Sequence, residues 1–287
     1  MNLDLIFKGF SRMPELGEEV FADRFTMQLG GGAQLIPLVL KDVGCKVKLG
    51  TFLSDDDTST ICRMLLDRRG FDDYEVFDAA AVDPVVVTSV FSWPHDRAFL
   101  AHNAMVREDR LDSETVYDFL KDAKVVFAPF GHTEVVRRLH EDGVIVVFDN
   151  GWRDDLSIDD FAEILPFVDV FTPNDKEALK MTGTASVSDA IRVLAAHTPH
   201  PCVTLGKGGC AVWDGGEIRC VPAWNEFEAV DTTGAGDNFL AGVIYGLIRD
   251  LPLLECVRIG NIFAGYSTSA VGCYGKRFSE EFLHRYL

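Results

Sequence analysis

The sequence predicts an α/β protein built on a largely parallel β-sheet. Short runs rich in β-branched and aromatic residues alternate with helical patterns through most of the 287 residues. Several of these runs are nearly continuous apolar stretches, as expected of strands that are covered on both faces. No internal repeat, low-complexity tract or linker interrupts the alternation, so we expect a single domain over 1–287.

The expected elements follow this alternation in chain order. We expect core strands at 3–7, 46–52, 124–130, 144–150, 168–174 and 201–206. We expect helices at 33–43, 57–69, 112–121, 132–142, 159–166, 175–182, 187–197, 237–250, 253–271 and 279–286. The helical segments repeat apolar residues three and four positions apart, as Phe239, Leu240, Val243 and Ile244 do.

Two segments in the first third of the chain break the rhythm. Residues 18–29 and 85–102 look like antiparallel strand material, and "PHDR" supplies the turn of a hairpin in the second. We interpret them as a small β flap on the α/β body, with strands within about 8–29 and 84–103. The alternative is an additional antiparallel edge of the main sheet.

The composition limits the classes of function. With 47% hydrophobic residues the chain has ample material for a core, and its net charge is −18. Such a charge disfavours nucleic acids and anionic membranes as partners, because both attract basic surfaces. A phosphorylated ligand would need local attraction from backbone N–H groups, a lysine or a bound cation.

The seven cysteines are scattered and form no CxxC pair, which favours reduced thiols over disulfides or a zinc site. The start "MNLDLIFKGF" has no basic region of the kind that begins a signal peptide. We therefore expect a cytoplasmic protein.

The stretch "VDTTGAGDNF" contains the strongest candidate site. The preceding "EFEAV" (226–230) alternates like a strand and a helical pattern follows, so Gly234 and Gly236 fall at a strand-to-helix junction. Backbone N–H groups at a helix N-terminus suit a phosphate or a migrating phosphoryl group. Asp237, in the first helical turn, could accept a proton from a substrate hydroxyl. The alternative is a turn followed by an ordinary helix cap.

Two other phosphate-binding motifs do not match. "GAGDNF" lacks the final glycine of the dinucleotide fingerprint, and "GKGG" (206–209) lacks the Ser or Thr of a P-loop.

The motif "DTTGAGD" resembles the second signature of the ribokinase or PfkB-like carbohydrate kinase family. Four further segments resemble family segments in the same order along the chain. They are "ELGEEVFADRF" (15–25), "GGGAQL" (30–35), "TPNDKEALKMTG" (172–183) and "VTLGKGGCAVW" (203–213). The resemblance implies a ribokinase-like three-layer α/β/α body with a mostly parallel central sheet and a small β-sheet lid. It also implies ATP and Mg²⁺, with a sugar or similar alcohol as phosphoryl acceptor.

The resemblance assigns the chemistry to particular residues. Asp237 matches the general base, and the backbone of Gly234, Ala235 and Gly236 matches the anion hole. The substrate-binding residues would be Asp4, Gly31, Gly32 and Gln34.

The nucleotide and metal positions are matched as well. Asn174 and Glu177 match residues that organise hydrated Mg²⁺, and Lys207, Gly208 and Asn261 match nucleotide-binding positions. Asp231 and Thr233 match positions that ligate a monovalent cation such as K⁺ in some members, together with carbonyl groups at about 268–275. Structural alternatives are a helix cap at Asn174, a solvated acid at Glu177, a turn lysine at Lys207, a strand end at Asp4 and a turn role for Asp231.

The sequence departs from the family in two places. Where members usually carry an acceptor-binding asparagine, this chain has Gln34, Leu35 and Ile36, of which Gln34 could partly substitute. The chain also begins close to Asp4, and we expect upstream residues to add stability. These departures leave two alternatives open: a nucleoside kinase of the same fold, and a non-catalytic nucleotide-binding regulatory homologue. The apolar flap predicts a homodimer formed through the lid.

Overall fold

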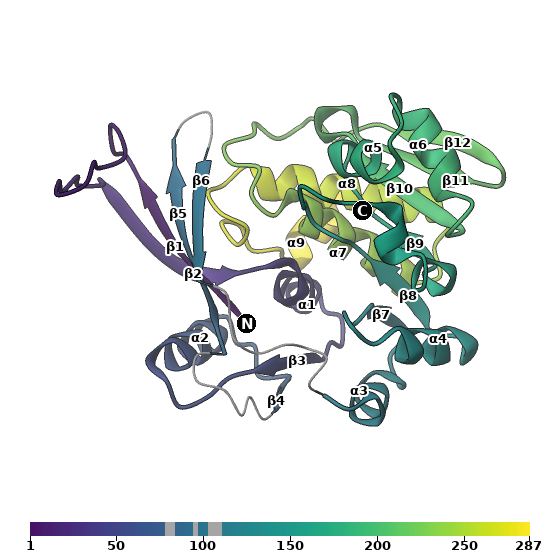
Figure 1. The fold of residues 1–287 in the computed structure, drawn as a ribbon, viewed down its shortest axis with the longest axis horizontal. Coiled ribbons are helices and arrows are strands. Elements are labelled where there is room, and N and C mark those ends of the chain that lie inside the picture. The colour runs from purple at the N-terminus through teal and green to yellow at the C-terminus, as the bar shows by residue number, and fades with distance from the viewer. Residues whose placement is uncertain (78–83, 94–96, 103–110) are drawn as a thin grey trace. The chain divides into compact units, whose positions relative to one another are not determined.

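The structure is a computed structural model that describes residues 1–77, 84–93, 97–102 and 111–287 (Figure 1). The chain forms two compact units. The first comprises Met1–Lys41 and Lys46–Arg107, and the second comprises Asp42–Cys45 and Glu108–Leu287. Each unit contains its own β-sheet.

The first unit contains a four-stranded sheet in the order β2-β1-β5-β6. Its strands are β1 (Asn2–Lys8), β2 (Arg24–Gly30), β5 (Val86–Ser92) and β6 (Arg97–His102). The other elements of this part of the chain are α1 (Gly32–Asp42), β3 (Leu49–Phe52), α2 (Asp57–Arg68) and β4 (Tyr74–Phe77). β3 and β4 form a separate parallel pair. Asp56 caps α2, because its carboxylate accepts a hydrogen bond from Ser59 N at 2.8 Å.

The strand that we predicted for the core at 3–7 belongs to this four-stranded sheet. β1 pairs antiparallel with β2 and parallel with β5, both of which come from the segments predicted as flap material. Both edges of β1 are thereby paired, so it adds no strand to the sheet of the second unit. The turn predicted at "PHDR" spans 94–97, of which 94–96 lie outside the described residues.

The second unit contains a six-stranded sheet in the order β12-β11-β10-β9-β8-β7. Its strands are β7 (Val125–Phe127), β8 (Ile145–Phe148), β9 (Val170–Phe171), β10 (His200–Thr204), β11 (Cys210–Asp214) and β12 (Glu217–Val221). Strands β7 to β10 are parallel, and β11 and β12 continue the sheet as an antiparallel hairpin. Its α-helices are α3 (Ser113–Leu120), α4 (Thr133–Glu141), α5 (Asp175–Thr182), α6 (Val187–Leu194), α7 (Ala235–Ile248), α8 (Leu253–Thr268) and α9 (Glu280–Tyr286).

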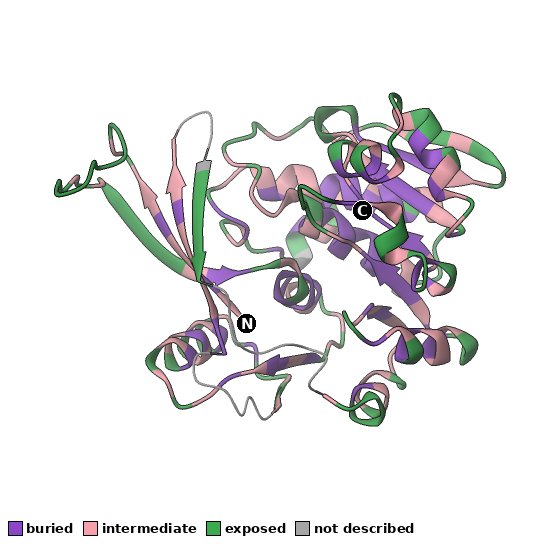
Figure 2. Cartoon of the chain, viewed as in Figure 1, coloured by how far each residue is buried: buried purple, intermediate pink, exposed green. Residues whose placement is uncertain are grey.

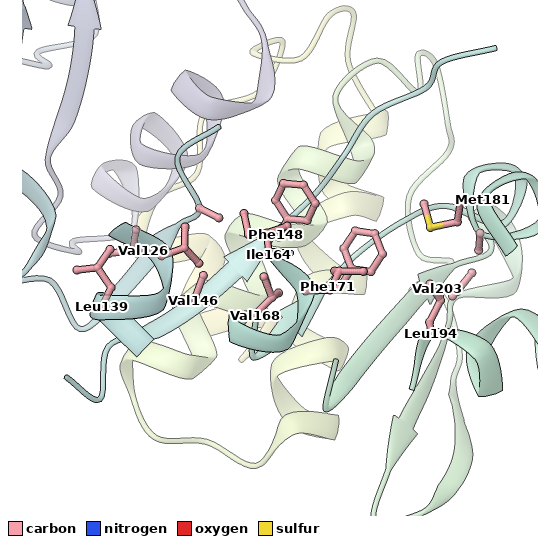
Figure 3. Close-up of a cluster of buried hydrophobic side chains, with 14 of the residues drawn as sticks. Val126, Leu139, Val146, Phe148, Ile164, Val168, Phe171, Met181, Leu194 and Val203 are labelled. Atoms are coloured by element: carbon pink, nitrogen blue, oxygen red, sulfur yellow. The ribbon is translucent and has the colours of Figure 1, made fainter. Parts of the chain in front are cut away.

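One face of the six-stranded sheet packs against α3 to α6 in a continuous apolar core (Figure 3). Val146 and Phe148 of β8, Phe171 of β9 and Val203 of β10 point into this core and are almost completely buried. Figure 2 shows the strands of this sheet as a largely buried layer. The alternate strand residues, such as Val147, are also buried. Since strand side chains alternate between faces, this sheet is covered on both faces, as the continuous apolar runs predicted.

Helices α7 and α8 pack against each other through glycines. A Cβ added to Gly242 would lie 2.8 Å from Gly260 Cα, and one added to Gly260 would lie 2.8 Å from the ring of Phe239. A Cβ on Gly246 would lie 2.7 Å from Cys256 Sγ. The two helices therefore approach so closely that these glycine positions have no room for a side chain.

Two predicted elements have a different secondary structure from the one expected. The segment predicted as a helix at 159–166 forms two short 3-10 turns, Ile158–Phe161 and Leu165–Phe167, with Pro166 inside the second. Proline lacks the N–H that a continuing α-helix would need. The predicted strand at 226–230 is irregular, and Val230 N instead donates a hydrogen bond to Thr268 O at 2.7 Å.

No helix in the described part of the chain is both long enough and apolar enough to cross a membrane. The seven cysteines all lie in described residues, and all are free thiols.

Candidate active site

Polar residues follow the carboxyl ends of three neighbouring parallel strands in the second unit. Asp149 and Asn150 come directly after β8, Asn174 follows β9 and Lys207 follows β10. Because β8, β9 and β10 are parallel, their carboxyl ends meet at one edge of the sheet. In open α/β sheets this edge is where ligands bind. The fold therefore brings together residues that are far apart in the sequence.

Asn174 and Glu177 form a reciprocal capping box at the start of α5. Asn174 Oδ1 accepts a hydrogen bond from Glu177 N, and Glu177 Oε2 accepts one from Asn174 N, both at 2.9 Å. The predicted alternative of a helix cap at Asn174 is thus correct as a description of its contacts. Glu177 is only 6% exposed, so the alternative of a solvated acid is wrong. Burial raises the pKa of Glu177 above its ordinary value.

The glycine-containing turn leads directly into α7. Gly234 adopts a left-handed conformation with φ of 73°, which favours glycine, and its carbonyl accepts hydrogen bonds from Asn238 N and Asn238 Nδ2. Ala235 N donates to Thr232 O at 3.2 Å, so this member of the predicted anion hole is engaged within the turn. A Cβ on Gly236 would meet no atom within 4 Å, which means that space is open at this position. Asp237 follows in the first turn of α7.

Three carboxylates of the second unit share an electrostatic environment. Burial raises the pKa of Asp237 to about 6, and the charge of Glu177 adds to this effect. Burial, followed by the charges of Asp237 and Glu177, raises the pKa of Asp149 to about 8. Like charges held near one another disfavour simultaneous ionisation. Repulsion among these three carboxylates disfavours their ionised forms, and a bound cation would reduce it.

Sequence reasoning did not identify Asp149. The available signal was its position, because Asp149 directly follows a buried parallel strand, and Asn174 follows the next strand in the sheet. Residues in these positions meet at the same edge of a parallel sheet. The raised pKa of Asp149 marks it as a candidate functional group.

The oxygen groups of this region fit a hydrated cation. Among the described residues, no three His, Cys, Asp or Glu side chains are grouped closely enough to hold a metal ion directly. Asn150 Oδ1, directly after Asp149, is buried without a hydrogen-bond partner. Mg²⁺ prefers oxygen ligands and retains several waters when it binds. The carbonyl oxygen of Asn150 and the neighbouring carboxylates of Asp149, Asp237 and Glu177 therefore suit Mg²⁺ held through water.

Asp231 connects the turn to the loop after α8. Its Oδ1 accepts hydrogen bonds from Thr233 N at 2.9 Å and Thr233 Oγ1 at 2.6 Å, and its Oδ2 accepts one from Gly272 N at 2.9 Å. Asp231 N also donates to Thr268 O at 3.0 Å. The predicted turn role of Asp231 is present in these contacts.

The predicted nucleotide-binding residues lie around the β10–β11 turn and on α8. Lys207 and Gly208 belong to the exposed 3-10 turn Gly206–Gly208. The next residue, Gly209, has φ of 89°, and a Cβ there would lie 2.1 Å from Val221 O. Asn261 lies on α8, where its Nδ2 donates to Val221 O at 3.1 Å and to Pro222 O at 3.0 Å. The amide of Asn261 thus anchors the end of β12.

The predicted acceptor-binding residues belong to the first unit. Asn2 and Asp4 lie two residues apart on β1, so their side chains share one face of the sheet. A Cβ on Gly30 would lie 2.3 Å from the Asp4 carboxylate, and one on Gly31 would lie 2.7 Å from the Asn2 side-chain amide. Burial raises the pKa of Asp4 to about 6. Asn2 and Gly30 were not identified from the sequence, although they adjoin the residues that were.

Gln34 and its neighbours occupy the start of α1, which begins at Gly32. The amide of Gln34 makes two hydrogen bonds to the main chain of Asn2, at 3.1 and 3.0 Å. Leu35, one of the residues that stand where members usually carry the asparagine, is fully buried.

Solved structures of the same fold include sugar and nucleoside kinases. A ribokinase from Thermotoga maritima matches with a TM-score of 0.79 and 21% identity, over 99% of this chain and 96% of that chain. An Arabidopsis thaliana ribokinase complexed with ribose and ATP matches with a TM-score of 0.81 and 19% identity, over 99% and 94% of the two chains. A Burkholderia thailandensis nucleoside kinase in complex with inosine matches with a TM-score of 0.76 and 17% identity, over 99% and 95%. These matches confirm the predicted ribokinase-like α/β/α fold.

The chain belongs to the pfkB family of carbohydrate kinases, whose family model matches residues 3–277. A cytidine kinase from Thermococcus kodakarensis is 36% identical over 148 residues, which are 48% of this chain and 53% of that protein. This match spans about half of the cytidine kinase. A fructoselysine 6-kinase from Shigella flexneri is 28% identical over 251 residues, which are 85% of this chain and 91% of that protein. Family membership supports a kinase that acts on a sugar or a nucleoside.

Proposed function

We propose that this protein transfers the γ-phosphoryl group of ATP to a hydroxyl of a sugar or sugar-like acceptor, with Asp237 as general base. The observation that carries the proposal is the position of Asp237 in the first turn of α7, beside the open space at Gly236, with its pKa raised to about 6. A base of that pKa is ionised at neutral pH and still accepts a proton effectively.

In this reaction the side chain of Asp237 and the backbone of residues 234–236 have different roles. Asp237 takes the proton of the acceptor hydroxyl as its oxygen forms a bond to the γ-phosphorus. The bond from that phosphorus to the bridging oxygen breaks, and its electron pair leaves with ADP. The backbone of Gly234, Ala235 and Gly236 stabilises the charge of the migrating phosphoryl group, with the N–H of Gly236 as its principal donor, because Ala235 N bonds within the turn.

The nucleotide is held by residues of the second unit. We assign Lys207 and Gly208 to the phosphates and Asn261 to the helix beside the adenine. Asn174, Glu177 and Asp149 hold hydrated Mg²⁺, which supplies positive charge to the phosphates when it is bound. Burial and the neighbouring charges of Asp237 and Glu177 raise the pKa of Asp149, which supports its inclusion in this set.

A monovalent cation is a further part of the proposal. Asp231 and Thr233 would hold K⁺ together with carbonyl groups of the loop at about 268–275. The hydrogen bond from Gly272 N to Asp231 supports a shared structural role of the turn and that loop.

The acceptor is bound by residues of the first unit. Asp4 accepts hydrogen bonds from acceptor hydroxyls, Gly31 and Gly32 allow close approach to the backbone, and Asn2 adds an amide beside Asp4. Gln34 contributes through the main chain of Asn2, to which its amide is bonded.

The second candidate is a nucleoside kinase. The 36% identity to a cytidine kinase favours it, whereas the 28% identity to a fructoselysine 6-kinase covers more of the chain and favours a sugar derivative. An ADP-release assay with ribose, fructoselysine, inositol, cytidine and adenosine separates the two. Turnover of nucleosides alone would show that the acceptor is a nucleoside and not a sugar. ATP binding without turnover of any acceptor would favour a regulatory homologue.

The base assignment is tested by Asp237→Asn. We expect this variant to lose phosphoryl transfer while it retains most of its affinity for ATP, because the amide cannot accept the proton. Near-normal turnover would refute the assignment.

We also propose that the protein is a cytoplasmic homodimer that associates through the four-stranded sheet. Leu5, Phe7, Phe25, Met27 and Leu100 share one face of this sheet by their register. Phe25 is 52% exposed and Leu100 is 69% exposed. A second copy would cover this apolar face. A monomeric mass by light scattering at micromolar concentration would contradict the proposal.

A further inference from the structure

Gln34 makes a contact that its sequence neighbourhood does not reveal. It lies in the first turn of α1 and is only 5% exposed. Its Oε1 accepts a hydrogen bond from Asn2 N at 3.1 Å, and its Nε2 donates one to Asn2 O at 3.0 Å. A side-chain amide thus pairs with both main-chain groups of one strand residue, as a residue of a neighbouring strand would.

The need for this contact follows from the path of the chain. β2 ends at Gly30, and at Gly31 the backbone turns with φ of 83° into α1. Asn2, the first residue of β1, is paired in register with Gly30, the last residue of β2, so Gln34 adds a further partner where this strand pair ends. Main-chain groups at a strand end are stabilised by hydrogen bonds, and the amide of Gln34 adds two such bonds from the helix.

The strand end that Gln34 holds carries the acceptor groups. The Asn2 side chain lies over Gly31 and the Asp4 carboxylate lies over Gly30, so close that a Cβ on either glycine would displace these side chains. The position of β1 relative to this turn therefore sets the positions of both polar side chains. A shift of β1 by a fraction of an ångström would move both of them together.

We propose that Gln34 is a positioning residue for the acceptor: by pairing with the main chain of Asn2, it fixes the side chains of Asn2 and Asp4 over the glycine turn. Gln34 acts through β1 and does not itself contact the acceptor. This inference rests on the proposed function, because it requires that Asp4 bind the acceptor.

The test compares two variants of Gln34 with a matched control. Gln34→Met keeps the approximate side-chain length and removes both hydrogen bonds. Gln34→Glu keeps the oxygen that accepts from Asn2 N and loses the donor to Asn2 O. Leu35→Met is the control, because it changes a buried residue in the same helical turn at nearly constant volume. The acceptor is the best substrate among ribose, fructoselysine and cytidine.

The expected result is a change in the KM for the acceptor without a matching change in the KM for ATP. Gln34→Met should raise the acceptor KM about tenfold with little change in the KM for ATP, Gln34→Glu should have a smaller effect, and Leu35→Met should change neither. An unchanged acceptor KM in Gln34→Met, or a parallel rise in both KM values, would overturn the inference. If Gln34→Met does not fold, the same comparison applies to Gln34→Glu.

A second measurement does not depend on turnover. Carbon-13 NMR of aspartate-labelled protein reports the pKa of Asp4, with the signal assigned by Asp4→Asn. Loosening of β1 should admit water and move the pKa of Asp4 from about 6 toward 3.8 in Gln34→Met but not in Leu35→Met. An unchanged pKa of Asp4 would count against the inference.

The Asp4→Asn variant also distinguishes an error in the proposed acceptor site from an error in the inference about Gln34. If Asp4→Asn leaves the acceptor KM unchanged, the proposed acceptor site itself is wrong. If Asp4→Asn raises that KM while Gln34→Met and Gln34→Glu do not, only the inference about Gln34 is wrong.

Discussion

Replacing Asp237 with asparagine should stabilise the protein while it abolishes activity. Burial raises the pKa of Asp237 from 3.8 to about 6, so the folded state is the poorer environment for the ionised carboxylate. Each pKa unit corresponds to about 1.36 kcal/mol, and a rise of about two units therefore destabilises the folded state by about 3 kcal/mol at neutral pH. The asparagine side chain carries no charge, so the Asp237→Asn protein should avoid this cost.

The expected pH dependence follows from proton binding. Between pH 3.8 and about 6 the folded state retains a proton on Asp237 that the unfolded state has released, so the unfolding free energy falls as pH rises. The difference between Asp237→Asn and the wild type should be near zero at pH 3.8 and largest above pH 6. The variant also relieves Asp149, whose pKa the charge of Asp237 helps to raise.

Urea unfolding between about pH 4 and 8, without nucleotide or Mg²⁺, measures this difference. The control is Asp122→Asn, which replaces an exposed aspartate of the same unit and should show no comparable gain. If Asp237→Asn is no more stable than the wild type at neutral pH, or if its effect is independent of pH, the electrostatic reasoning is refuted.

Three further variants test separate parts of the site. Gly236→Ala should fold normally, because its Cβ meets no atom within 4 Å, yet it should lower kcat by narrowing the space for the phosphoryl group; full activity would contradict the assigned anion hole. Gly209→Ala should destabilise the protein by about 1–3 kcal/mol in thermal melting, because φ is 89° and the Cβ would lie 2.1 Å from Val221 O; an unchanged melting temperature would show that the β-hairpin adjusts. Glu177→Gln keeps an oxygen for the hydrogen bond from Asn174 N and should melt near the wild-type temperature, but it should need more Mg²⁺ for half-maximal rate; an unchanged Mg²⁺ titration would remove Glu177 from the metal site.

Local patterns predicted those parts of the fold whose signals lie within a few residues. Helix α5 has the predicted bounds, 175–182, because Asn174 and Glu177 form a complete capping box and Gly183 ends the helix in a left-handed conformation. The start of α7 was predicted within two residues for a similar reason, since Gly234 marks the turn that precedes it.

Pairing over long sequence distances was not predictable in the same way. The apolar run at 3–7 identifies a strand, but it does not specify which strands it joins, and β1 pairs with β2 and β5. The alternating run at 226–230 resembles a strand, yet the backbone of Val230 and Asp231 bonds to Thr268 on another element. Such partners depend on tertiary contacts that periodicity does not encode.

The same difference between local and long-range signals applies to the residues of the candidate site. Motif spelling identified Asp237, Asn174 and Glu177, because their surroundings are contiguous in the sequence. Asp149 was missed, because its raised pKa depends on burial in the folded structure and on the charges of Asp237 and Glu177, which are distant in the sequence. The two hydrogen bonds from Gln34 to Asn2 were missed as well, because they span 32 positions.

The glycine contact between α7 and α8 has a consequence for how this protein can change during evolution. Gly242 and Gly260 meet where neither could accept even a methyl group, so a larger residue at one cannot be accommodated by shrinking the other. Helix α7, which carries Asp237 in its first turn, therefore packs against a helix that leaves no room for a larger residue at either glycine. Mutational libraries that aim at a new acceptor should leave Gly242 and Gly260 fixed, keep Gly31 because its φ of 83° favours glycine, and draw their diversity from β1.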